Sequence, residues 1–253
     1  MARNPGQIPG SADKRMSLKP NKRMKTLFLI PARGGSKGIP HKNIKDFAGK
    51  PLILYAVDQA LSLADTNDIC VSTDDKEIKS VVESYGVPVP FLRPAELATD
   101  QAGSYETMLH ALDFYQKKGI RYDTLILLQP TSPFRTVRHI QEARGLYERI
   151  PGCDMVVSVK EAESNPYYAM YKENEDGYLQ PLSSTRYTRR QDCPAVYEYN
   201  GAVYVIRTSS LRQSPLSGFR KIVKYKMDAI DSIDLDTPLD WMFAEFLQHR
   251  KME

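Results

Sequence analysis

The stretch TLFLIPARGGSKGIPHKN spans residues 26–43, and its two halves differ in composition. Residues 27–30 are apolar and predict a buried strand. The turn that follows is rich in glycine, which lets a backbone approach an anion closely, and in cations that supply the countercharge. Its glycines and cations are Arg33, Gly34, Gly35, Lys37, Gly38 and Lys42. A strand that opens into such a turn indicates a phosphate site, for which a nucleoside triphosphate is the natural ligand.

Two common phosphate motifs do not fit this turn. Its spacing is neither the G-x-x-x-x-G-K-[ST] of a P-loop nor the G-x-G-x-x-G of a dinucleotide fold. The residue types alone leave an alternative open, a surface loop that glycine makes flexible and lysine makes soluble.

Outward from this turn, short apolar runs alternate with helical patterns. The expected strands lie near 26–31, 68–73 and 123–129, and the expected helices near 51–64, 75–85, 103–118 and 137–149. Such alternation predicts an α/β fold, a doubly wound, mostly parallel sheet with helices on both faces. The apolar runs in the first and third strands are nearly continuous, as in strands that are covered on both faces.

Three motifs fall at the carboxyl ends of predicted strands, where open α/β sheets bind their ligands. They are PARGGSKG at 31–38, VSTDD at 71–75 and LLQPTSP at 127–133. Because parallel strands end at the same edge of a sheet, we expect these motifs to meet in one crevice.

The rhythm of the sequence changes after about Lys160. Residues 161–199 are rich in Tyr, Arg and Ser, and a strand at 201–207 and a final helix at 238–249 are expected after them. One interpretation is an irregular, β-rich insertion whose tyrosines cover the sheet edge. The other, which the aromatic content favours, is an interface with a second subunit.

The net charge of +4 is concentrated in the first 23 residues. Six Lys or Arg oppose Asp13 alone there, a balance of +5 that leaves −1 for the rest of the chain. The segment has no hydrophobic periodicity and predicts a disordered basic tail, with a basic docking arm as the alternative. Since the remaining chain has no general positive excess, we expect no nucleic-acid partner.

The cellular setting is predicted from what the sequence lacks. No run approaches membrane-spanning length, and the first residues lack the apolar core of a secretory signal. Cys70, Cys153 and Cys193 form neither a C-x-x-C pair nor an even set. We therefore expect no membrane partner and a reducing, cytoplasmic setting, with Cys70 and Cys153 packed in the core.

Five segments together carry a family resemblance. PARGGSKGIPHKN at 31–43 resembles the N-terminal signature of the acylneuraminate cytidylyltransferases, which make CMP-activated nine-carbon sugars. Four further segments agree with the family in order and approximate spacing: VSTDD at 71–75, LRPAELATD at 92–100, LLQPTSPFRT at 127–136 and DSIDLDTPLD at 231–240. The resemblance implies one nucleotidyltransferase domain over 24–253 and a homodimer that uses the 161–199 insertion.

The chemistry that the resemblance implies is attack by the anomeric hydroxyl of a 2-keto sugar acid on the α-phosphorus of CTP, with pyrophosphate leaving. Arg33 and Lys42 would clamp the triphosphate, and Lys37 would face the developing charge. The implied nucleotide-binding residues are Arg33, Gly34, Gly35, Ser36, Lys42, Asn43, Arg93 and Ser104. Three of these have ordinary alternatives: Asn43 as a turn residue, Arg93 as a solvated side chain and Ser104 as a helix N-cap.

For the sugar, the resemblance implies contacts from Gln129 and Arg135, which follow a predicted buried strand. A neutral amide recognises hydroxyl or amide groups, and a guanidinium pairs with a carboxylate through two hydrogen bonds. Arg190, Asn200 and Tyr204 match the RQ…NGAxY pattern of the family, whereas the Tyr-Glu-Tyr at 197–199 departs from it. The acceptor stays open among N-acetylneuraminate, its deaminated analogue KDN, legionaminate and pseudaminate.

The segment DSIDLDTPLD at 231–240 holds the expected metal ligands. If residues 232–236 are extended, Asp234 and Asp236 point to one side while Ile233 and Leu235 face the core. Mg²⁺ is often bound by one or two carboxylates together with substrate phosphates, and the resemblance assigns both aspartates to this cofactor and to catalysis. The alternative is that Asp236 caps the helix that begins near Pro238.

Two rival functions remain at this point. A cytidylyltransferase for the eight-carbon acid Kdo has a signature resembling PARxxSxRLPGKxL after its first strand, from which GGSKGIPHKN differs. A nucleotide- or sugar-binding module without catalysis is disfavoured because both metal-site aspartates are present.

Overall fold

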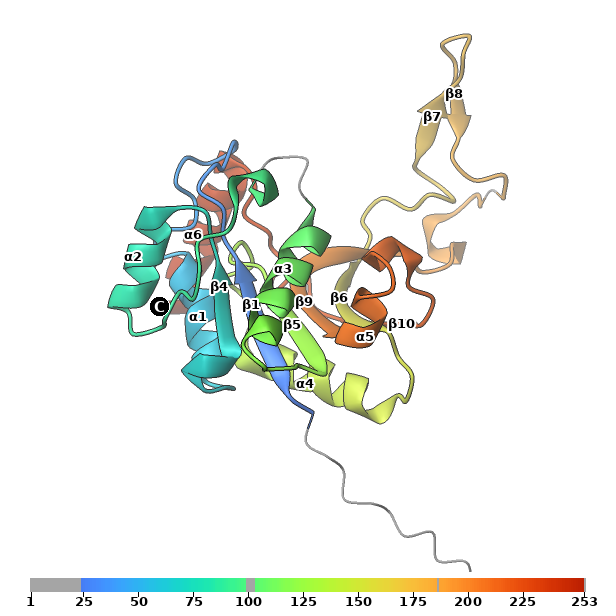
Figure 1. Cartoon of the computed structure of the whole chain (residues 1–253). Helices are drawn as coiled ribbons and strands as arrows, with labels where there is room; N and C mark the ends of the chain where they lie inside the picture. The colour runs from blue at the N-terminus through green and yellow to red at the C-terminus, as the bar shows by residue number, and fades with distance from the viewer. Residues whose placement is uncertain (1–23, 99–102, 186, 253) are drawn as a thin grey trace, which may run out of the picture.

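A six-stranded sheet forms the centre of the molecule (Figure 1). The computed structural model describes residues 24–98, 103–185 and 187–252. Across the sheet, the strands run in the order β10 (Ile222–Lys226), β6 (Met155–Glu161), β9 (Tyr197–Arg207), β5 (Thr124–Leu128), β1 (Thr26–Pro31) and β4 (Ile69–Ser72). The predicted disordered tail at 1–23 lies outside the described residues.

Most neighbouring strands are parallel. β1 pairs in parallel with both β4 and β5, and β6 does so with β10. β9 runs antiparallel to both of its neighbours, β5 and β6. The carboxyl ends of the five parallel-running strands therefore lie at one edge, together with the beginning of β9. The predicted mostly parallel sheet is confirmed.

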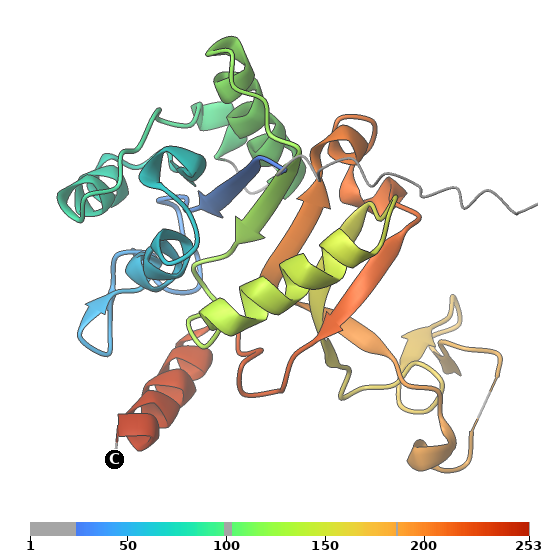
Figure 2. The same cartoon turned by 90° about the horizontal axis from the view of Figure 1, so that it is seen from below.

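Helices cover both faces of this sheet, as the nearly continuous apolar strands require. They are α1 (Ile53–Leu61), α2 (Lys76–Ser84), α3 (Ser104–Lys117), α4 (Val137–Arg149), α5 (Thr208–Leu211) and α6 (Pro238–Met252). Alternate residues of β1 face opposite cores: Phe28 packs with Ile53 of α1 and Ile140 of α4, and Leu29 packs with Met108 of α3. Figure 2 shows α4 lying across one face.

A third, smaller core lies under α6. It joins the glycine-rich turn, the hairpin of β2 (Asp46–Phe47) and β3 (Lys50–Pro51), the loop after β5, and the acidic segment before α6. Its buried members are Ile39, Phe47, Leu52, Phe134, Leu235, Trp241 and Ala244. This core fixes the acidic segment against the turn.

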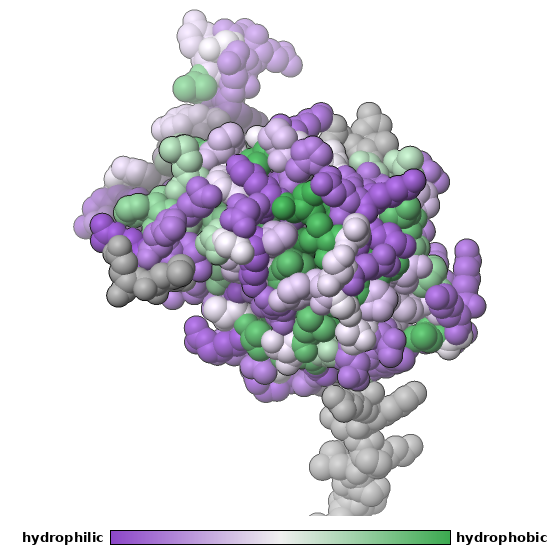
Figure 3. All heavy atoms as spheres, turned by 90° about the vertical axis from the view of Figure 1, so that its left-hand side faces the viewer, coloured by the Kyte–Doolittle hydropathy of each residue, from purple (hydrophilic) through white to green (hydrophobic). Residues whose placement is uncertain are grey.

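The segment 161–199 projects from this body (Figure 1). Between the end of β6 and the start of β9, its described residues form a hairpin of two three-residue strands, β7 (Tyr171–Glu173) and β8 (Leu179–Pro181), and one short 3₁₀ turn, η3 (Arg190–Asp192). The remaining 3₁₀ turns, in the body, are η1 (Thr66–Asp68), η2 (Ala95–Leu97) and η4 (Leu216–Gly218). In Figure 3 the hairpin stands above a face on which small apolar patches lie between hydrophilic side chains.

The predicted elements are found with small shifts, and two strands of the central sheet were not predicted. The helix expected at 51–64 begins at Ile53, because the β2–β3 hairpin occupies the residues before it. The strand expected at 201–207 begins at Tyr197. β6 and β10 were not among the predicted strands, although both belong to the central sheet. Cys70 and Cys153 are buried as predicted, and within the described residues no helix is long and apolar enough to cross a membrane.

Candidate active site

A cavity of ≈ 560 Å³ opens at the carboxyl edge of the sheet. The glycine-rich turn forms one wall, and the loop after β5, the acidic segment before α6, and Arg93 with the start of α3 form the others. Its lining includes the predicted site residues Arg33, Ser36, Lys37, Lys42, Asn43, Arg93, Ser104, Gln129, Asp234 and Asp236. Two of the three motifs expected to converge thus line one crevice. The third, VSTDD, does not line it but contacts the turn and Arg93 through Asp74.

The charges in this cavity suit an anion. Four cations line it, Arg33, Lys37, Lys42 and Arg93, against two carboxylates. The side chain of Lys42 is only 12% exposed, and its ammonium donates to Asp236 Oδ1 at 3.0 Å and to the carbonyl of Leu235 at 2.7 Å. This pair ties the turn to a segment almost 200 residues later in the chain.

Two glycines of the turn are required by close approach. A Cβ on Gly38 would lie 2.2 Å from the carbonyl oxygen of Asp236, and one on Gly34 would lie 2.4 Å from Asp75 Oδ2. A side chain at position 38 would therefore require a backbone shift, and one at position 34 would have to displace the Asp75 side chain. Gly35 has open space around it. The turn is thus shaped to press against the acidic segment.

Two backbone amides of the turn are already engaged. The N–H of Gly34 donates to Asp74 Oδ1 at 3.2 Å, and that of Ser36 donates to the carbonyl of Gly34 at 3.0 Å. The expectation that the backbone from Gly34 to Ser36 holds phosphate oxygens is therefore corrected at these two amides, and Gly34 and Gly35 do not line the cavity.

Asp74 of the VSTDD motif connects the turn with the opposite wall. The same Oδ1 that accepts a hydrogen bond from the N–H of Gly34 also accepts one from Nη2 of Arg93, at 3.4 Å. Arg93 is buried and donates through Nη1 to the Thr107 hydroxyl at 3.2 Å. Burial lowers the pKa of Arg93, and Asp74 opposes that shift. Arg93 is therefore not a solvated side chain.

The two aspartates predicted to bind a metal differ in environment. The Oδ1 atom of Asp234 is buried and has no hydrogen-bond partner, whereas the side chain of Asp236 is 70% exposed and pairs with Lys42. Burial raises the pKa of Asp234; Asp236 raises it further, and the Thr131 hydroxyl and Lys42 lower it. Both aspartates line the cavity and Leu235 between them is buried, as the alternating pattern predicts.

The alternative role of Asp236 as a helix cap is wrong. The Thr237 hydroxyl accepts the N–H of Asp240 at 3.2 Å, and the Asp240 carboxylate accepts the N–H groups of Asp236 and Thr237. This reciprocal cap begins α6 without the Asp236 side chain. The Asp236 carboxylate is thus left to the cavity.

The acidic pair fits a divalent cation. A buried carboxylate oxygen without a partner is costly to desolvate, and a cation satisfies it. Within the described residues no group of three or more His, Cys, Asp or Glu side chains is placed to hold a metal. A metal here would therefore take its remaining ligands from a phosphate and water, which Mg²⁺ accepts.

A second cavity, of ≈ 610 Å³, shares Asp234 with the first. The ends of β6 and β9 and the segment from Ala229 to Asp234 line it, together with Phe243 of α6. Lys160 is the one cation in its lining, and its ammonium lies 3.1 Å from Glu198 Oε1. Ile230, Ile233 and Phe243 give the cavity an apolar side. The two cavities together can hold a nucleotide and a neighbouring polar acceptor.

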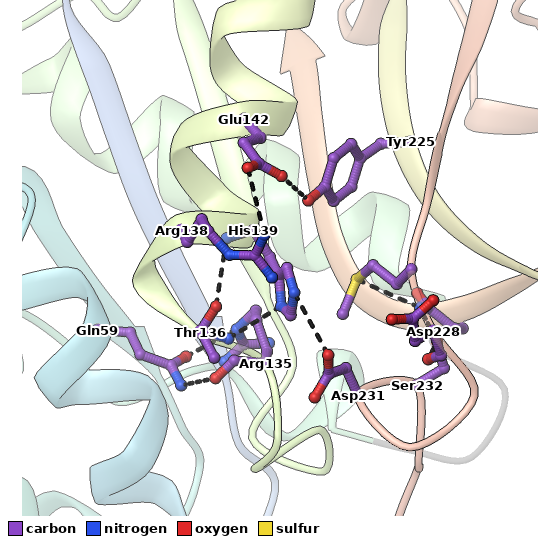
Figure 4. Close-up of polar contacts among 12 residues, drawn as sticks. Gln59, Arg135, Thr136, Arg138, His139, Glu142, Tyr225, Asp228, Asp231 and Ser232 are labelled. Atoms are coloured by element: carbon purple, nitrogen blue, oxygen red, sulfur yellow. Dashed lines mark hydrogen bonds and ion pairs between the residues drawn. The ribbon is translucent and has the colours of Figure 1, made fainter.

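Arg135 is not placed to bind a substrate carboxylate. It is 2% exposed, and its guanidinium donates to the carbonyls of Gln129 and Ala202 and to Oε1 of Gln59. Figure 4 shows Gln59 and Arg135 facing one another, with His139 and Asp231 3.5 Å apart in the same region. The sequence-based role of Arg135 is corrected: the antiparallel β9 buries this side chain.

Three further predicted sugar contacts are also placed outside the first cavity. Asn200 is buried, although it borders the second cavity. Its Oδ1 accepts from the Ser158 hydroxyl and the N–H of Ala202, and its Nδ2 donates to the Ser232 hydroxyl. Tyr204 packs in the core, where burial raises its pKa to about 12. Arg190 is exposed in the projecting segment and donates to the Glu163 carbonyl. Of these three, Asn200 alone lines either of the two cavities.

Asn43 and Ser104, both predicted to lie near the cytidine, line the cavity. Asn43 is buried, and its Nδ2 donates to the carbonyl of Arg33 at 3.0 Å, so it supports the turn. Ser104 is the first residue of α3 and Gly103 is its N-cap, so the alternative of a capping serine is wrong.

Asp74, Lys160 and Glu198 were not predicted as site residues. Asp74 lay within a quoted motif at a strand end, and its acidic type beside a cationic turn was the available signal. Lys160 required recognition of β6, whose run at 155–159 is fully buried. Glu198 borders the cavity because β9 begins earlier than expected.

Three comparisons place the chain among known proteins. A family model described as cytidylyltransferase matches residues 27–249. A CMP-N,N'-diacetyllegionaminic acid synthase of Legionella pneumophila is 33% identical over 234 residues, which cover 91% of this chain and 99% of that protein. An N-acylneuraminate cytidylyltransferase of Escherichia coli O18:K1:H7 is 34% identical over 90% of this chain. The matched part covers about half, 53%, of that longer protein.

The fold is similar to a solved structure. A CMP:2-keto-3-deoxy-manno-octonic acid synthetase complexed with CTP superposes with a TM-score of 0.68 at 19% identity, over 90% of this chain and 99% of that one. At this identity the likeness concerns the fold, and it agrees with the sheet and helix layers described above.

Proposed function

Because this chain belongs to the cytidylyltransferase family, we propose that it transfers CMP from CTP to a nine-carbon 2-keto sugar acid and releases pyrophosphate. The observation that carries the proposal is the pair of adjoining cavities. One is lined by four cations and the acidic pair, and the other shares Asp234 with it. The names of the relatives, a legionaminic acid synthase and N-acylneuraminate cytidylyltransferases, support this acceptor class.

In the proposed reaction, the anomeric hydroxyl oxygen of the acceptor forms a bond with the α-phosphorus of CTP. The bond between that phosphorus and the bridging oxygen of the β-phosphate breaks, pyrophosphate leaves with the electron pair, and the hydroxyl proton passes to solvent. Negative charge grows on the phosphoryl oxygens and on the leaving group. Cations that are already in place stabilise this charge without reorganising.

The side chains of the first cavity divide this work. Arg33 and Lys37 stand on the turn that opens directly from β1, where a triphosphate would lie at the strand ends. Lys42, held at the acidic segment, would neutralise phosphate oxygens close to Asp236. Arg93, fixed by Asp74 and Thr107, would lie on the side of the cytosine and ribose together with Ser104.

We propose Mg²⁺ as the cofactor of this site. Asp234 and Asp236 would hold it, and it would supply Lewis-acid stabilisation to the phosphate oxygens that it shares with them. The buried, unpartnered oxygen of Asp234 supports this assignment.

The acceptor would occupy the second cavity. Gln129 at the boundary offers a neutral amide for hydroxyl or acylamino groups, and Lys160 offers the positive charge that a sugar carboxylate requires. Ile230 and Phe243 suit the methyl groups of N-acyl substituents. We therefore propose N-acylated nonulosonates as preferred acceptors over KDN, which lacks such a group.

We also propose a homodimer. The segment 161–199 exposes apolar and aromatic side chains that this chain does not cover: Tyr168, Met170, Tyr171, Tyr178, Leu179 and Leu182. Exposed aromatic side chains gathered on one projection are typical of an interface. The same segment adjoins the second cavity through Glu163, so a partner bound there would border the acceptor site.

A pyrophosphate-release assay tests the function. CTP, UTP, ATP and GTP are each offered with N-acetylneuraminate, KDN, legionaminate, pseudaminate and Kdo. We expect release with CTP and a nine-carbon acid, and little release with the other nucleotides. Equal turnover with all four nucleotides contradicts the cytidine assignment, preference for Kdo selects the eight-carbon alternative, and CTP binding without any turnover indicates a binding module.

A further inference from the structure

We propose that Arg135 is a positioning residue that bridges the ends of β5 and β9 and thereby fixes Gln129 in the cavity. The inference rests on the proposed function insofar as Gln129 contacts the acceptor. Arg135 itself is buried and lines neither of the two cavities.

The bridge lies where a sheet ladder ends. The antiparallel pairing of β5 with β9 runs as far as Leu128 and Val203. The next two residues, Gln129 and Ala202, are not paired by backbone hydrogen bonds in that ladder. Instead, Nη1 of Arg135 donates to both of their carbonyl oxygens, to that of Gln129 at 3.0 Å and to that of Ala202 at 2.7 Å. One guanidinium nitrogen thus replaces the next step of the ladder.

Arg135 is itself locked by α1. Its Nε donates to Gln59 Oε1 at 2.7 Å, and Gln59 Nε2 donates back to the carbonyl of Arg135 (Figure 4). Gln59 is buried on the face of α1 that packs on the sheet. The position of the guanidinium is therefore set by a helix, not by a flexible loop.

The burial of this charge demands a role. Within the described residues no carboxylate lies within ion-pair distance of Arg135, and its guanidinium donates to neutral oxygens. Burial lowers the pKa of Arg135 to about 9, so it remains charged at neutral pH. A charge buried without a counterion is costly, and only a group with several fixed donors satisfies two carbonyls and an amide at once.

The bridged residues border the point where the two cavities meet. A Cβ on Gly201 would lie 3.4 Å from Gln129 Oε1 and 3.5 Å from Asp234 Oδ2, so both side chains converge beside the residue that precedes Ala202. Arg135 holds the backbone on both sides of this meeting point. A shift of either strand end would move Gln129 relative to Asp234.

The test compares Arg135→Lys with Arg207→Lys. Lysine keeps the charge but cannot bridge both carbonyls and Gln59. Arg207 is the matched control, since it lies at the other end of β9 and donates through Nε to the Cys153 carbonyl at 2.8 Å. We expect Arg135→Lys to raise the KM of the acceptor about tenfold or more, as small misplacements of a binding group do, with CTP affinity within about twofold.

A double-mutant cycle separates positioning from general destabilisation. In a Gln129→Ala background, Arg135→Lys should add little to the acceptor KM, because its effect passes through Gln129. Additive effects, an unchanged acceptor KM, or an equal effect of Arg207→Lys would overturn the proposal. If Arg135→Lys fails to fold, Gln59→Ala takes its place in the cycle, since it removes the side chain that holds the Arg135 guanidinium.

A readout without turnover keeps the two proposals distinguishable. The side-chain amide signal of Gln129 in a ¹⁵N NMR spectrum, assigned through its loss in Gln129→Ala, should move in Arg135→Lys and stay in place in Arg207→Lys. An unmoved signal overturns the positioning role whatever the enzyme assay shows. A moved signal in a chain that turns over no acceptor supports the positioning role and rejects the proposed function.

Discussion

The glycine-rich turn at 31–43 and the projecting segment at 161–199 are held in opposite ways. The turn is fixed by the chain itself, through Asp74, through the pair of Lys42 with Asp236, and through a buried core below it. The projection instead exposes Tyr178 (71%) and Leu179 (70%) at its hairpin. This difference fits the proposed function, in which one chain would complete the phosphate half of the site and a second copy would cover the other half.

The largest effect should come from Asp236→Asn. The amide keeps the size of the carboxylate but loses its charge, so turnover should fall roughly 10²-fold, on the scale of losing a preorganised transition-state stabiliser. Pyrophosphate release at saturating CTP and Mg²⁺ measures it.

The control for that variant is Thr237→Ala, which weakens the cap of α6 and leaves the acidic pair in place. Loss of such a cap costs about 1 kcal/mol of stability. We expect a lower melting temperature with normal turnover. Near-normal turnover of Asp236→Asn would contradict the proposed metal site. The cationic side chains alone would then have to bind the phosphates.

The next effect concerns the close packing of the turn. Gly38→Ala should lower turnover about tenfold or more, because the added methyl meets the Asp236 carbonyl and pushes the turn from the acidic pair by a distance that catalysis does not tolerate. Steady-state kinetics with CTP varied measures the loss.

Gly35→Ala is the matched variant, since open space surrounds that position. Near-normal kinetics are expected. A loss as large as that of Gly38→Ala would instead show that an anion approaches the backbone at Gly35, as the sequence alone suggested.

A smaller effect should follow from polar substitution of the hairpin. Tyr178→Ser with Leu179→Ser should weaken the dimer and raise the acceptor KM about three- to tenfold, because interface side chains that matter contribute about 1 kcal/mol or more each. Light scattering over a dilution series and acceptor kinetics provide the measurements.

Lys172→Ser with Gln180→Ser alters the same hairpin at two polar, paired positions and should leave the dimer intact. If the protein without substitutions is a stable, active monomer, the proposed homodimer is refuted. The two regions would then differ in shape but not in their need for a partner.

The smallest effect is expected from removal of residues 1–23. The sequence predicts a disordered tail, which would make no packing contacts, so the melting temperature and turnover should stay nearly unchanged. A drop of many degrees in a thermal scan would show that the basic segment docks on the body.

Much of the fold was predictable because its signals are local. Each predicted strand and helix up to residue 149 is present, since apolar periodicity depends on neighbours in sequence. β10 was missed because it is only partly buried and its alternating composition, IVKYK, gives a weak signal. β9 was predicted as a strand, but its antiparallel placement between β5 and β6 depends on contacts far apart in the chain.

The site divides in the same way. Asp234 and Asp236 were found because alternation along an extended segment puts both on one side. The fate of Arg135 was not predictable, since the same loop arginine points to solvent or to the interior according to which strand lies beside β5. The burial of Asn200 and Tyr204 was unpredictable for the same reason, because both belong to that strand.

By itself, the sequence determined the strand that opens into a cationic glycine turn, the helices around it, the pair of aspartates and the family resemblance. Each depends on residue types at short spacing, where backbone geometry fixes which side chains share a face. Only the tertiary structure decided that Lys42 meets Asp236, that Asp74 joins the turn to Arg93, and that Arg135 is buried. These contacts join residues between 19 and 194 positions apart, and the order and direction of strands in the sheet set them.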